Sequence, residues 1–517
     1  MNELTIIVTW TSLLPPLAAI VLAVWSRHVV LSLFVGLWLG VSMLAGWNPI
    51  VGLYSLVVDF AWVQATDPWN VTVIILMLCI GGFVELVVRS GAAEAFATSL
   101  CRVVTNKVRA QVAVWFSGIV VFFSDSANPL ILGPLFRPLF DRLKVSREKL
   151  AYLIDSTASP ICILVPITSW AAYVLSLLSR ELQDLPVSET SMSAYLSSIP
   201  FQFYAIGSLL LVPLIGFLGL EYGPMRKAEQ RALAEMTTAQ TDASSTEQQQ
   251  TEPDPRTASA GAIALTTVGI VIFSALLLTG GFPDVGILKA IAAGNSVVAV
   301  TLGFVAGAIV LAGLLMKQGT MYFGAVTRNW VRGAIGMREV LVILVLAWSL
   351  GACCDALGTG VYVAGVVDRI VAPMLVPALV FLAGALISFA TGSAWGCYAI
   401  MMPIALPLAL QAGLPIHIVL AAVLSGGILG DHASPISDTT ILASMGSGCE
   451  HVEHVRTQLP YAATVAFAAT FGFLLVGVWP TSWMLLPVLG LLVVTALALS
   501  WIANRKTAVA GETGQAR

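Results

Sequence analysis

Carboxylate and hydroxyl side chains interrupt the apolar sequence of this chain at a few places, and two of these places nearly repeat each other. The first reads DSTASPICILVP from Asp155, and the second reads GDHASPISDTT from Gly430. Both contain Ala-Ser-Pro-Ile, with an aspartate just upstream. Proline and small hydroxyl residues break a membrane helix, and a freed backbone group or a lone carboxylate is costly in hydrocarbon. The two segments therefore predict helix breaks that line a protected polar site.

Acids within apolar sequence are the first candidates for that site, because an ionisable residue in a membrane segment is usually functional. They are Glu85, Asp125, Asp155, Asp355, Asp431 and Asp438. Four of them stand among hydroxyl and amide side chains. The ion- or substrate-binding residues that we predict are Asp125, Ser126, Asn128, Asp155, Ser156, Thr157, Ser159, Thr391, Ser393, Asp431, Ser434, Ser437, Asp438 and Thr439. For Glu85 and Asp355, a place in the site, an ion pair with arginine and a scaffold role are open alternatives.

Carboxylate, hydroxyl and amide oxygens, together with the carbonyl groups freed by an unwound helix, are hard ligands that suit Na⁺. A carboxylate in such a place holds either a metal cation or a proton, and this competition is the minimal device for cation/proton exchange. The candidates for proton coupling are Asp125, Asp155, Asp431, His432 and Asp438. His432 is either a proton shuttle or a hydrogen-bonded group that orients its neighbours. Several of the hydroxyl groups have the alternative role of capping half-helices.

The composition predicts an all-α polytopic membrane protein. Of 517 residues, 58% are hydrophobic and 10% are charged, and the mean hydropathy is +0.91, whereas a soluble domain carries about 25% charged residues. Recurrent apolar runs give roughly 10 to 13 spans plus re-entrant segments. Clusters of Lys and Arg, among them Arg328, Arg332 and Arg338, mark cytoplasmic loops, while residues 47–70 and 181–199 are poor in both and predict external loops. Trp and Tyr near span ends predict interfacial anchors.

The two breaks belong to two chain halves that share further landmarks in the same order. Ser126 lies 35 residues after Gly91, and Ser393 lies 35 residues after Gly358. Each serine interrupts an apolar stretch, and the arms of the first are too short to cross the membrane twice, which is typical of a re-entrant hairpin. We therefore predict two inverted repeats, each with a re-entrant helical hairpin and a broken transmembrane helix, that meet near the membrane midplane.

These landmarks also define the predicted organisation of the chain. The N-terminal membrane half covers residues 1–222, with a hairpin at about 110–140 and a broken helix at about 150–178. A hydrophilic cytoplasmic linker, residues 223–258, has no periodicity and is predicted to be unstructured. The C-terminal membrane half and a cytoplasmic tail follow, with predicted bounds of 259–503 for the half, about 374–412 for its hairpin, about 416–446 for its broken helix and 504–517 for the tail.

No sequence pattern supports a resident cofactor or a transition-metal site. The histidines of HVEHVR, His451 and His454, are too irregularly spaced for a metal site and are predicted, with His28 and His417, to lie at the solvated surface. The seven cysteines mostly lie in apolar helices, where a thiol behaves as a small hydrophobic group. Neither an HExxH motif nor a serine nucleophile elbow is present, so the chain is not predicted to be an enzyme.

The polar segments and their flanks resemble the NhaC-type Na⁺/H⁺ antiporter family of bacteria. The string from Ser124, SDSANPLILGPLFRPLFDRLKVSREKLAYLIDSTASPICILVPITSW, is similar to the first signature of that family, and GDHASPISDTTILASMGSGCEHVEHVRTQLPYA is similar to the second. The resemblance covers about residues 71–475 and implies inverted repeats with paired hairpins, an elevator movement and a homodimer. At the first tip the family tends to carry two adjacent acids, whereas this chain has Ser124 before a single Asp125.

The predicted function is secondary active transport in the cell (inner) membrane, in which cytoplasmic Na⁺ is exchanged for external H⁺ by alternating access. The alternative is a sodium- or proton-coupled transporter of a small organic anion or amino acid, because related members of the family carry malate, lactate or amino acids. The predicted partners are the lipid bilayer, Na⁺ and H⁺, with a small organic solute in the alternative. No nucleic-acid partner is predicted.

Overall fold

The structure is a computed structural model, and it describes residues 10–26, 28–92, 95, 104–183, 185–186, 189–238, 255–287, 290, 294–359, 362 and 372–514. Every regular element in this part of the chain is a helix. Ten helices are long and apolar enough to cross a membrane, and up to 12 spans result if each of two bent helix pairs is one span. The predicted all-α polytopic fold is therefore confirmed, and the number of spans lies within the predicted range.

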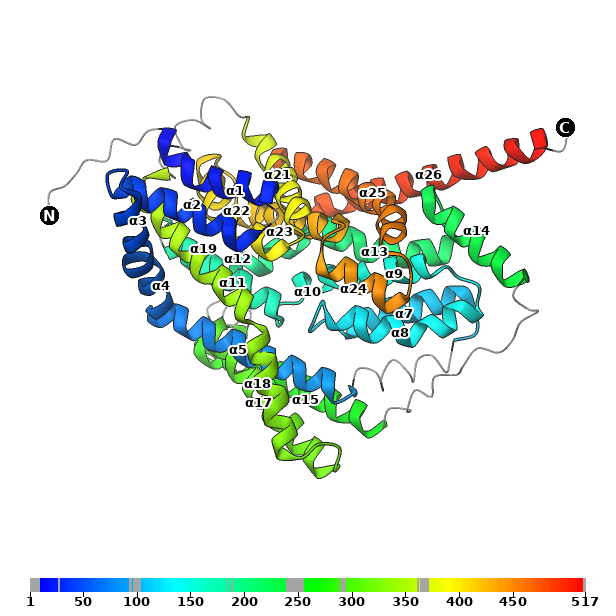
Figure 1. The fold of residues 1–517 in the computed structure, drawn as a ribbon, viewed down its shortest axis with the longest axis horizontal. Helices are drawn as coiled ribbons and strands as arrows, with labels where there is room; N and C mark the ends of the chain where they lie inside the picture. Colours follow the sequence, from blue (N-terminus) through cyan, green and yellow to red (C-terminus); the bar gives the residue numbers. More distant parts are fainter. Residues whose placement is uncertain are drawn as a thin grey trace.

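The described chain begins with a group of helices at one side of the molecule (Figure 1), namely η1 (Trp10–Leu13), α1 (Leu14–Ser26), α2 (Val29–Leu44), α3 (Pro49–Ser55), η2 (Leu56–Ala61), α4 (Trp62–Thr66) and α5 (Pro68–Arg89). The loop predicted at residues 47–70 is helical instead, because α3, η2 and α4 follow one another directly and Pro49–Thr66 is apolar enough for a span. Asn48 and Asp67 cap α3 and α5 by accepting backbone hydrogen bonds. The scarcity of Lys and Arg indicates a side of the membrane, but it does not exclude a helix.

The first hairpin consists of α7 (Lys107–Val120) and α8 (Ala127–Arg142). The broken helix after it consists of α9 (Arg147–Asp155), α10 (Ser159–Leu164) and α11 (Ser169–Gln183), with a bend of 43° before α11. Pro160 stands in the first turn of α10, where a missing N–H costs nothing because that N–H has no partner within the helix. The half ends with α12 (Ser191–Ser198), η3 (Ile199–Phe201) and α13 (Phe203–Leu218), of which α12 lies within residues predicted as a loop.

The second hairpin consists of α21 (Val376–Thr391) and α22 (Ala394–Gln411), preceded by η5 (Pro373–Leu375). Its broken helix consists of α23 (Ile416–Ala433) and α24 (Asp438–Ser447), and it is followed by α25 (His451–Val478), η6 (Ser482–Met484) and α26 (Leu485–Gly514). Gly392 at the hairpin tip has a φ of +66°, and a Cβ there would lie 2.7 Å from the carbonyl oxygen of Ile436. Only glycine therefore allows this tip to rest on the second break.

Between the halves lie α14 (Gly223–Thr238), α15 (Pro255–Thr279), α17 (Ser296–Lys317), α18 (Phe323–Gly336) and α19 (Arg338–Ala356). The prediction of an unstructured linker at residues 223–258 is wrong for residues 223–238 and 255–258, which are helical, while residues 239–254 lie outside the described part of the chain. Glu229 of α14 accepts hydrogen bonds from Ser146 and lies 3.3 Å from the buried Nζ of Lys149. Lys149 Nζ also lies 2.6 Å from Glu221. A buried lysine needs such partners. The polar composition of the linker does not reveal them.

The two halves interleave around the second break. α24 of the second half packs against α8 and α9 of the first half, while α21 packs along α23 (Figure 1). A Cβ on Gly133 of α8 would overlap the backbone of Gly446 on α24, so the two backbones touch there. Hairpins from both halves therefore enclose the pieces of the second broken helix.

Candidate functional site

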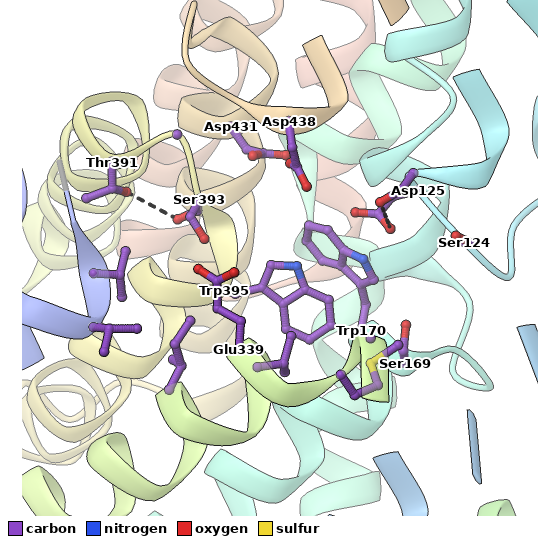
Figure 2. A pocket seen from close by; sticks show the side chains of 18 of the residues that line it. Ser124, Asp125, Ser169, Trp170, Glu339, Thr391, Ser393, Trp395, Asp431 and Asp438 are labelled. Carbon is purple, nitrogen blue, oxygen red and sulfur yellow. Dashed lines mark hydrogen bonds between the residues drawn. The ribbon is translucent and has the colours of Figure 1, made fainter. Parts of the chain in front are cut away.

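A cavity of about 510 Å³ lies between the tips of both hairpins and the second break (Figure 2). Its polar lining also includes residues from the first turns of α11 and α19, and it consists of His28, Ser124, Asp125, Ser126, Ser169, Glu339, Thr391, Ser393, Asp431 and Asp438. Side chains of six predicted site residues thus meet in one space. Of these, Asp125 and Ser126 come from the first half of the chain, and the other four come from the second half.

Acidic side chains dominate the electrostatics of this cavity. Asp125, Asp431, Asp438 and Glu339 all contribute to it, and its described lining contains no lysine or arginine. Helices α8, α22 and α24 begin beside the cavity, so the positive ends of their dipoles offset part of this negative charge. The rest of the negative charge is unfavourable in a site of low polarity until cations or protons neutralise it. The lining therefore favours positively charged occupants.

Asp431 is the most enclosed aspartate of the cavity, with 3% of its surface exposed. Ser159 of the first break donates a hydrogen bond of 2.9 Å to one carboxylate oxygen. Ser437 of the second break donates a hydrogen bond of 2.9 Å to the other oxygen, and its Oγ lies 3.1 Å from the hydroxyl of Thr439. The two duplicated breaks therefore converge on one carboxylate.

His432, the residue after Asp431, is fully held by hydrogen bonds. Its Nε2 lies 3.1 Å from the hydroxyl of Ser156, and its Nδ1 lies 2.8 Å from the hydroxyl of Tyr204. The side chain is buried and does not line the cavity. Since both ring nitrogens have partners, this geometry fits the orienting role of His432, which was the alternative to a proton shuttle.

Asp155 does not line the cavity but belongs to a separate buried cluster. Its Oδ2 accepts hydrogen bonds from Gln458 at 2.7 Å and from Thr440 at 3.2 Å, and Nε2 of His454 lies 3.9 Å away. Its Oδ1 has no hydrogen-bond partner within the described part of the chain. A buried carboxylate oxygen without a partner is a place where a proton or a cation relieves the cost of burial.

Asn128 and Thr157 connect the first hairpin to the first break. The amide nitrogen of Asn128 donates to the carbonyl of Gly118 at 3.2 Å and to that of Thr157 at 3.0 Å. The Thr157 hydroxyl donates to the carbonyl of Leu153 at 2.9 Å, one helical turn back. Neither residue lines the cavity, and Thr157 has the capping geometry that was the alternative to a ligand role.

The remaining predicted hydroxyl residues shape the tips. Ser393 caps α22 by accepting from the N–H of Gly396 at 3.3 Å, and Thr391 donates to the carbonyl of Ile387 at 2.9 Å. Ser434 donates to the carbonyl of Phe389 at 2.7 Å and is fully buried. Ser126 donates to the carboxylate of Asp125 at 3.4 Å. Of these four hydroxyl residues, only Ser434 does not line the cavity.

Two tryptophans that the sequence prediction left out also line the cavity. The ring centroids of Trp170 and Trp395 lie 4.9 Å apart, and Figure 2 places both indoles close to the carboxylates. The prediction of interfacial anchors is therefore wrong for these two residues. A signal was available, because one tryptophan directly follows a serine shortly after the first break and the other follows Ser-Ala at the second tip.

The prediction that His454 lies at the solvated surface is also wrong. His454 is fully buried, with its Nδ1 2.8 Å from Ser444 and its Nε2 2.9 Å from the side-chain oxygen of Gln458. Its spacing of four residues from Gln458 places both on one face of α25, which was the available signal. Glu85 forms an ion pair of 3.0 Å with Arg89, one of its three alternatives, and neither Glu85 nor Asp355 lines the cavity.

No three His, Cys, Asp or Glu side chains are grouped closely enough to chelate a metal ion within the described ranges. A cation in the cavity therefore has to use a carboxylate together with hydroxyl and carbonyl oxygens. Broken membrane helices bind Na⁺ with such ligands.

Comparison with known proteins places these features in a family context. The model of the "Na+/H+ antiporter family" matches residues 161–478. An uncharacterised protein of Haemophilus influenzae is 32% identical over 479 residues, which is 90% of each chain. A Bacillus subtilis protein named malate-2H(+)/Na(+)-lactate antiporter is 36% identical over 85 residues, 16% of this chain and 18% of its own. The YdaH transporter of Alcanivorax borkumensis has a similar fold, with a TM-score of 0.59, 18% identity and coverage of 89% of this chain and 98% of its own.

Proposed function

The chain belongs to the Na⁺/H⁺ antiporter family and is a multi-pass secondary transporter of the cell membrane, and from this premise we propose that it exchanges cytoplasmic Na⁺ for external H⁺. The observation that carries the proposal is the cavity in which four carboxylates meet without a lysine or arginine in the described lining. Such a cavity is stable when cations or protons occupy it, and exchange between the two is antiport.

In this proposal Asp431 is the central ligand. Ser159 and Ser437 each donate to a different carboxylate oxygen, which orients the carboxylate and leaves the remaining lone pairs for Na⁺. Asp438 and Asp125 face the same space and supply further oxygens or take up protons. Asp155, behind the cavity, carries a proton or a cation on its unpartnered oxygen.

Alternating access needs the cavity to open to one side of the membrane at a time. Both hairpin tips line the cavity, and each tip is connected to its arms by a short turn. We therefore assign to the hairpins and the broken helices an elevator-like movement as one unit, because they contact the carboxylates directly. In a homodimer, the remaining helices would stay fixed while this unit moves. Light scattering of the purified protein tests for the dimer, because it measures the mass of the particle.

Proteoliposomes that contain a pH-sensitive dye test the proposal. With an acidic interior, addition of external Na⁺ should make the interior more alkaline, and Asp431→Asn and Asp438→Asn should abolish this response. Ser388→Ala is a matched control, because Ser388 is buried in the second hairpin and its hydroxyl donates to the carbonyl of Gly427 rather than to a carboxylate. The proposal fails if the protein responds to none of Na⁺, Li⁺ and K⁺.

A second candidate is a sodium-coupled carrier of a small amino acid, which the volume of the cavity and its two indoles favour. About 510 Å³ is within the usual range for small-molecule sites and is larger than one ion requires. An ammonium group would meet the carboxylates and the tryptophan rings, while a solute carboxylate would meet the start of α8, α22 or α24. Uptake of a radiolabelled amino-acid panel separates the candidates, because only a solute carrier should accumulate a labelled amino acid, and Trp395→Leu should abolish that accumulation.

A further inference from the structure

Three arginines at the junction of α18 and α19 have no part in the acidic cavity. Arg328, Arg332 and Arg338 line a separate cavity of about 440 Å³, together with Val331 and Ile335. All three arginine side chains are exposed, and none forms an ion pair or a hydrogen bond with another described residue. Such a concentration of uncompensated positive charge is a site for an anion.

An apolar cleft of about 330 Å³ lies directly beside the arginines. It is formed by α5, α17 and α18, and its walls are Leu86, Val305, Ala308, Ile309, Ala312, Val326, Trp330 and Val331. Val331 lines both the cleft and the arginine cavity. On a helix, residues four apart lie on the same face, so Arg328 and Arg332 form a charged stripe that borders Thr327 and Val331 on the wall of the cleft.

The chemistry of the two neighbouring cavities differs in the way that the two ends of a lipid differ. A phosphate group needs positively charged donors, and an acyl chain needs an apolar groove. The arginines are on the cytoplasmic side by the positive-inside rule, and the cytoplasmic leaflet carries the anionic lipids of a cell membrane. Basic pockets between membrane helices on that side bind anionic headgroups.

We infer that this region is a binding site for one anionic phospholipid, whose headgroup phosphate contacts Arg328, Arg332 and Arg338 and whose acyl chain lies in the cleft of α5, α17 and α18. A free phosphate would use the arginines but not the cleft. A zwitterionic lipid would fill the cleft but would bring its own positive charge to the arginines. The site therefore selects lipids with a net negative headgroup.

The position of the site connects it to transport. Gly336 lines both the arginine cavity and the acidic cavity, and Glu339, one residue after Arg338, lines the acidic cavity. A bound lipid would hold the start of α19, and with it Glu339, against α5 and α17. This connection does not depend on which cation or solute the acidic cavity takes.

Lipid binding to the purified full-length protein tests the inference. Native mass spectrometry with added phosphatidylglycerol should show one tightly retained lipid, and phosphatidylcholine should bind at least 10-fold more weakly. Each basic side chain near an anionic lipid contributes about a factor of five, so the triple variant Arg328→Gln/Arg332→Gln/Arg338→Gln should weaken phosphatidylglycerol binding about 100-fold. The matched triple Arg109→Gln/Arg142→Gln/Arg456→Gln removes the same charge from exposed positions elsewhere and should change it less than about threefold.

Ala308→Phe tests the acyl-chain part of the site separately from the headgroup part, because it fills the cleft and leaves the arginines in place. It should weaken phosphatidylglycerol binding while inorganic phosphate at high concentration still competes at the arginines. The inference is overturned if the arginine triple variant, folded by its melting curve, retains phosphatidylglycerol like the wild type. Equal binding of phosphatidylcholine, or an Ala308→Phe variant with unchanged lipid affinity, would also overturn it.

Discussion

The hydrogen bond between Ser159 and Asp431 joins the two halves of the chain at the proposed ion ligand, and its removal is the sharpest test of that role. Ser159 and Ser437 each donate to a separate oxygen of Asp431 at 2.9 Å. Ser159→Ala and Ser437→Ala each remove one donor and leave the carboxylate in place. Both hydroxyl groups are buried, so water does not readily replace either one.

The magnitude follows from the charge of the acceptor. A hydrogen bond to a charged group contributes about 1.5–3 kcal/mol. Its loss makes the ionised carboxylate less favourable relative to the protonated one, so Na⁺ has to displace a more tightly held proton. At fixed pH, the Na⁺ concentration for half-maximal transport should therefore rise about 10- to 150-fold for each variant. The two effects are not expected to add, because both donors act on the same carboxylate.

The assay is a Na⁺ titration of the dye response in proteoliposomes at one pH, with the amount of inserted protein matched between variants. Ser388→Ala again is the control and should stay within about threefold of the wild type, because it loses a neutral hydrogen bond to the carbonyl of Gly427 and no bond to a carboxylate. If Ser159→Ala and Ser437→Ala both stay within threefold as well, Asp431 is not the ion ligand. If only Ser437→Ala shifts the titration, the first break does not take part in the site.

Three further predictions concern the structure around the site. Glu229→Ala leaves the buried Lys149 with Glu221 as its acidic partner and should lower the free energy of unfolding by about 1.5–3 kcal/mol in an SDS titration, with a smaller loss for Glu229→Gln, which still accepts hydrogen bonds. Gly446→Val should cost about 1–3 kcal/mol or more in the same titration because its side chain would enter the backbone of α8; an unchanged midpoint would show that the helices do not touch there. Gln458→Leu removes a donor from Asp155 and should cost about 1–3 kcal/mol, whereas unaltered stability would contradict the buried hydrogen bond.

The sequence predicted the features that depend on local chemistry. The two breaks are recognisable because proline and clustered hydroxyl residues cannot continue an apolar helix without cost, and the structure has α10 beginning at Ser159 and α24 beginning at Asp438. The hairpins are recognisable because their arms are short. The meeting of Asp125 with Asp431 and Asp438 followed from the repeat, which requires equivalent tips and breaks to face each other.

The features that the sequence missed depend on packing between distant elements. Trp170 and Trp395 have the composition of interfacial anchors, and only the meeting of α11 with α22 places them beside the carboxylates. Asp155 lies outside the cavity because Gln458 of α25 and Thr440 of α24 hold it behind the break. The helix α14 has a polar composition, and a buried partner 80 residues away, Lys149, stabilises it.

The bond between Ser159 and Asp431 also has a consequence for the synthesis of the protein. The two residues are 272 positions apart, and a ribosome adds roughly 5–20 residues per second. Ser159, Ser156 and Asp155 therefore enter the membrane roughly 15–55 s before their partners in the second half exist. During this interval the newly made first half carries a broken helix with a buried carboxylate and no companion. The newly made first half therefore has to hold these polar groups in the membrane until the second half arrives.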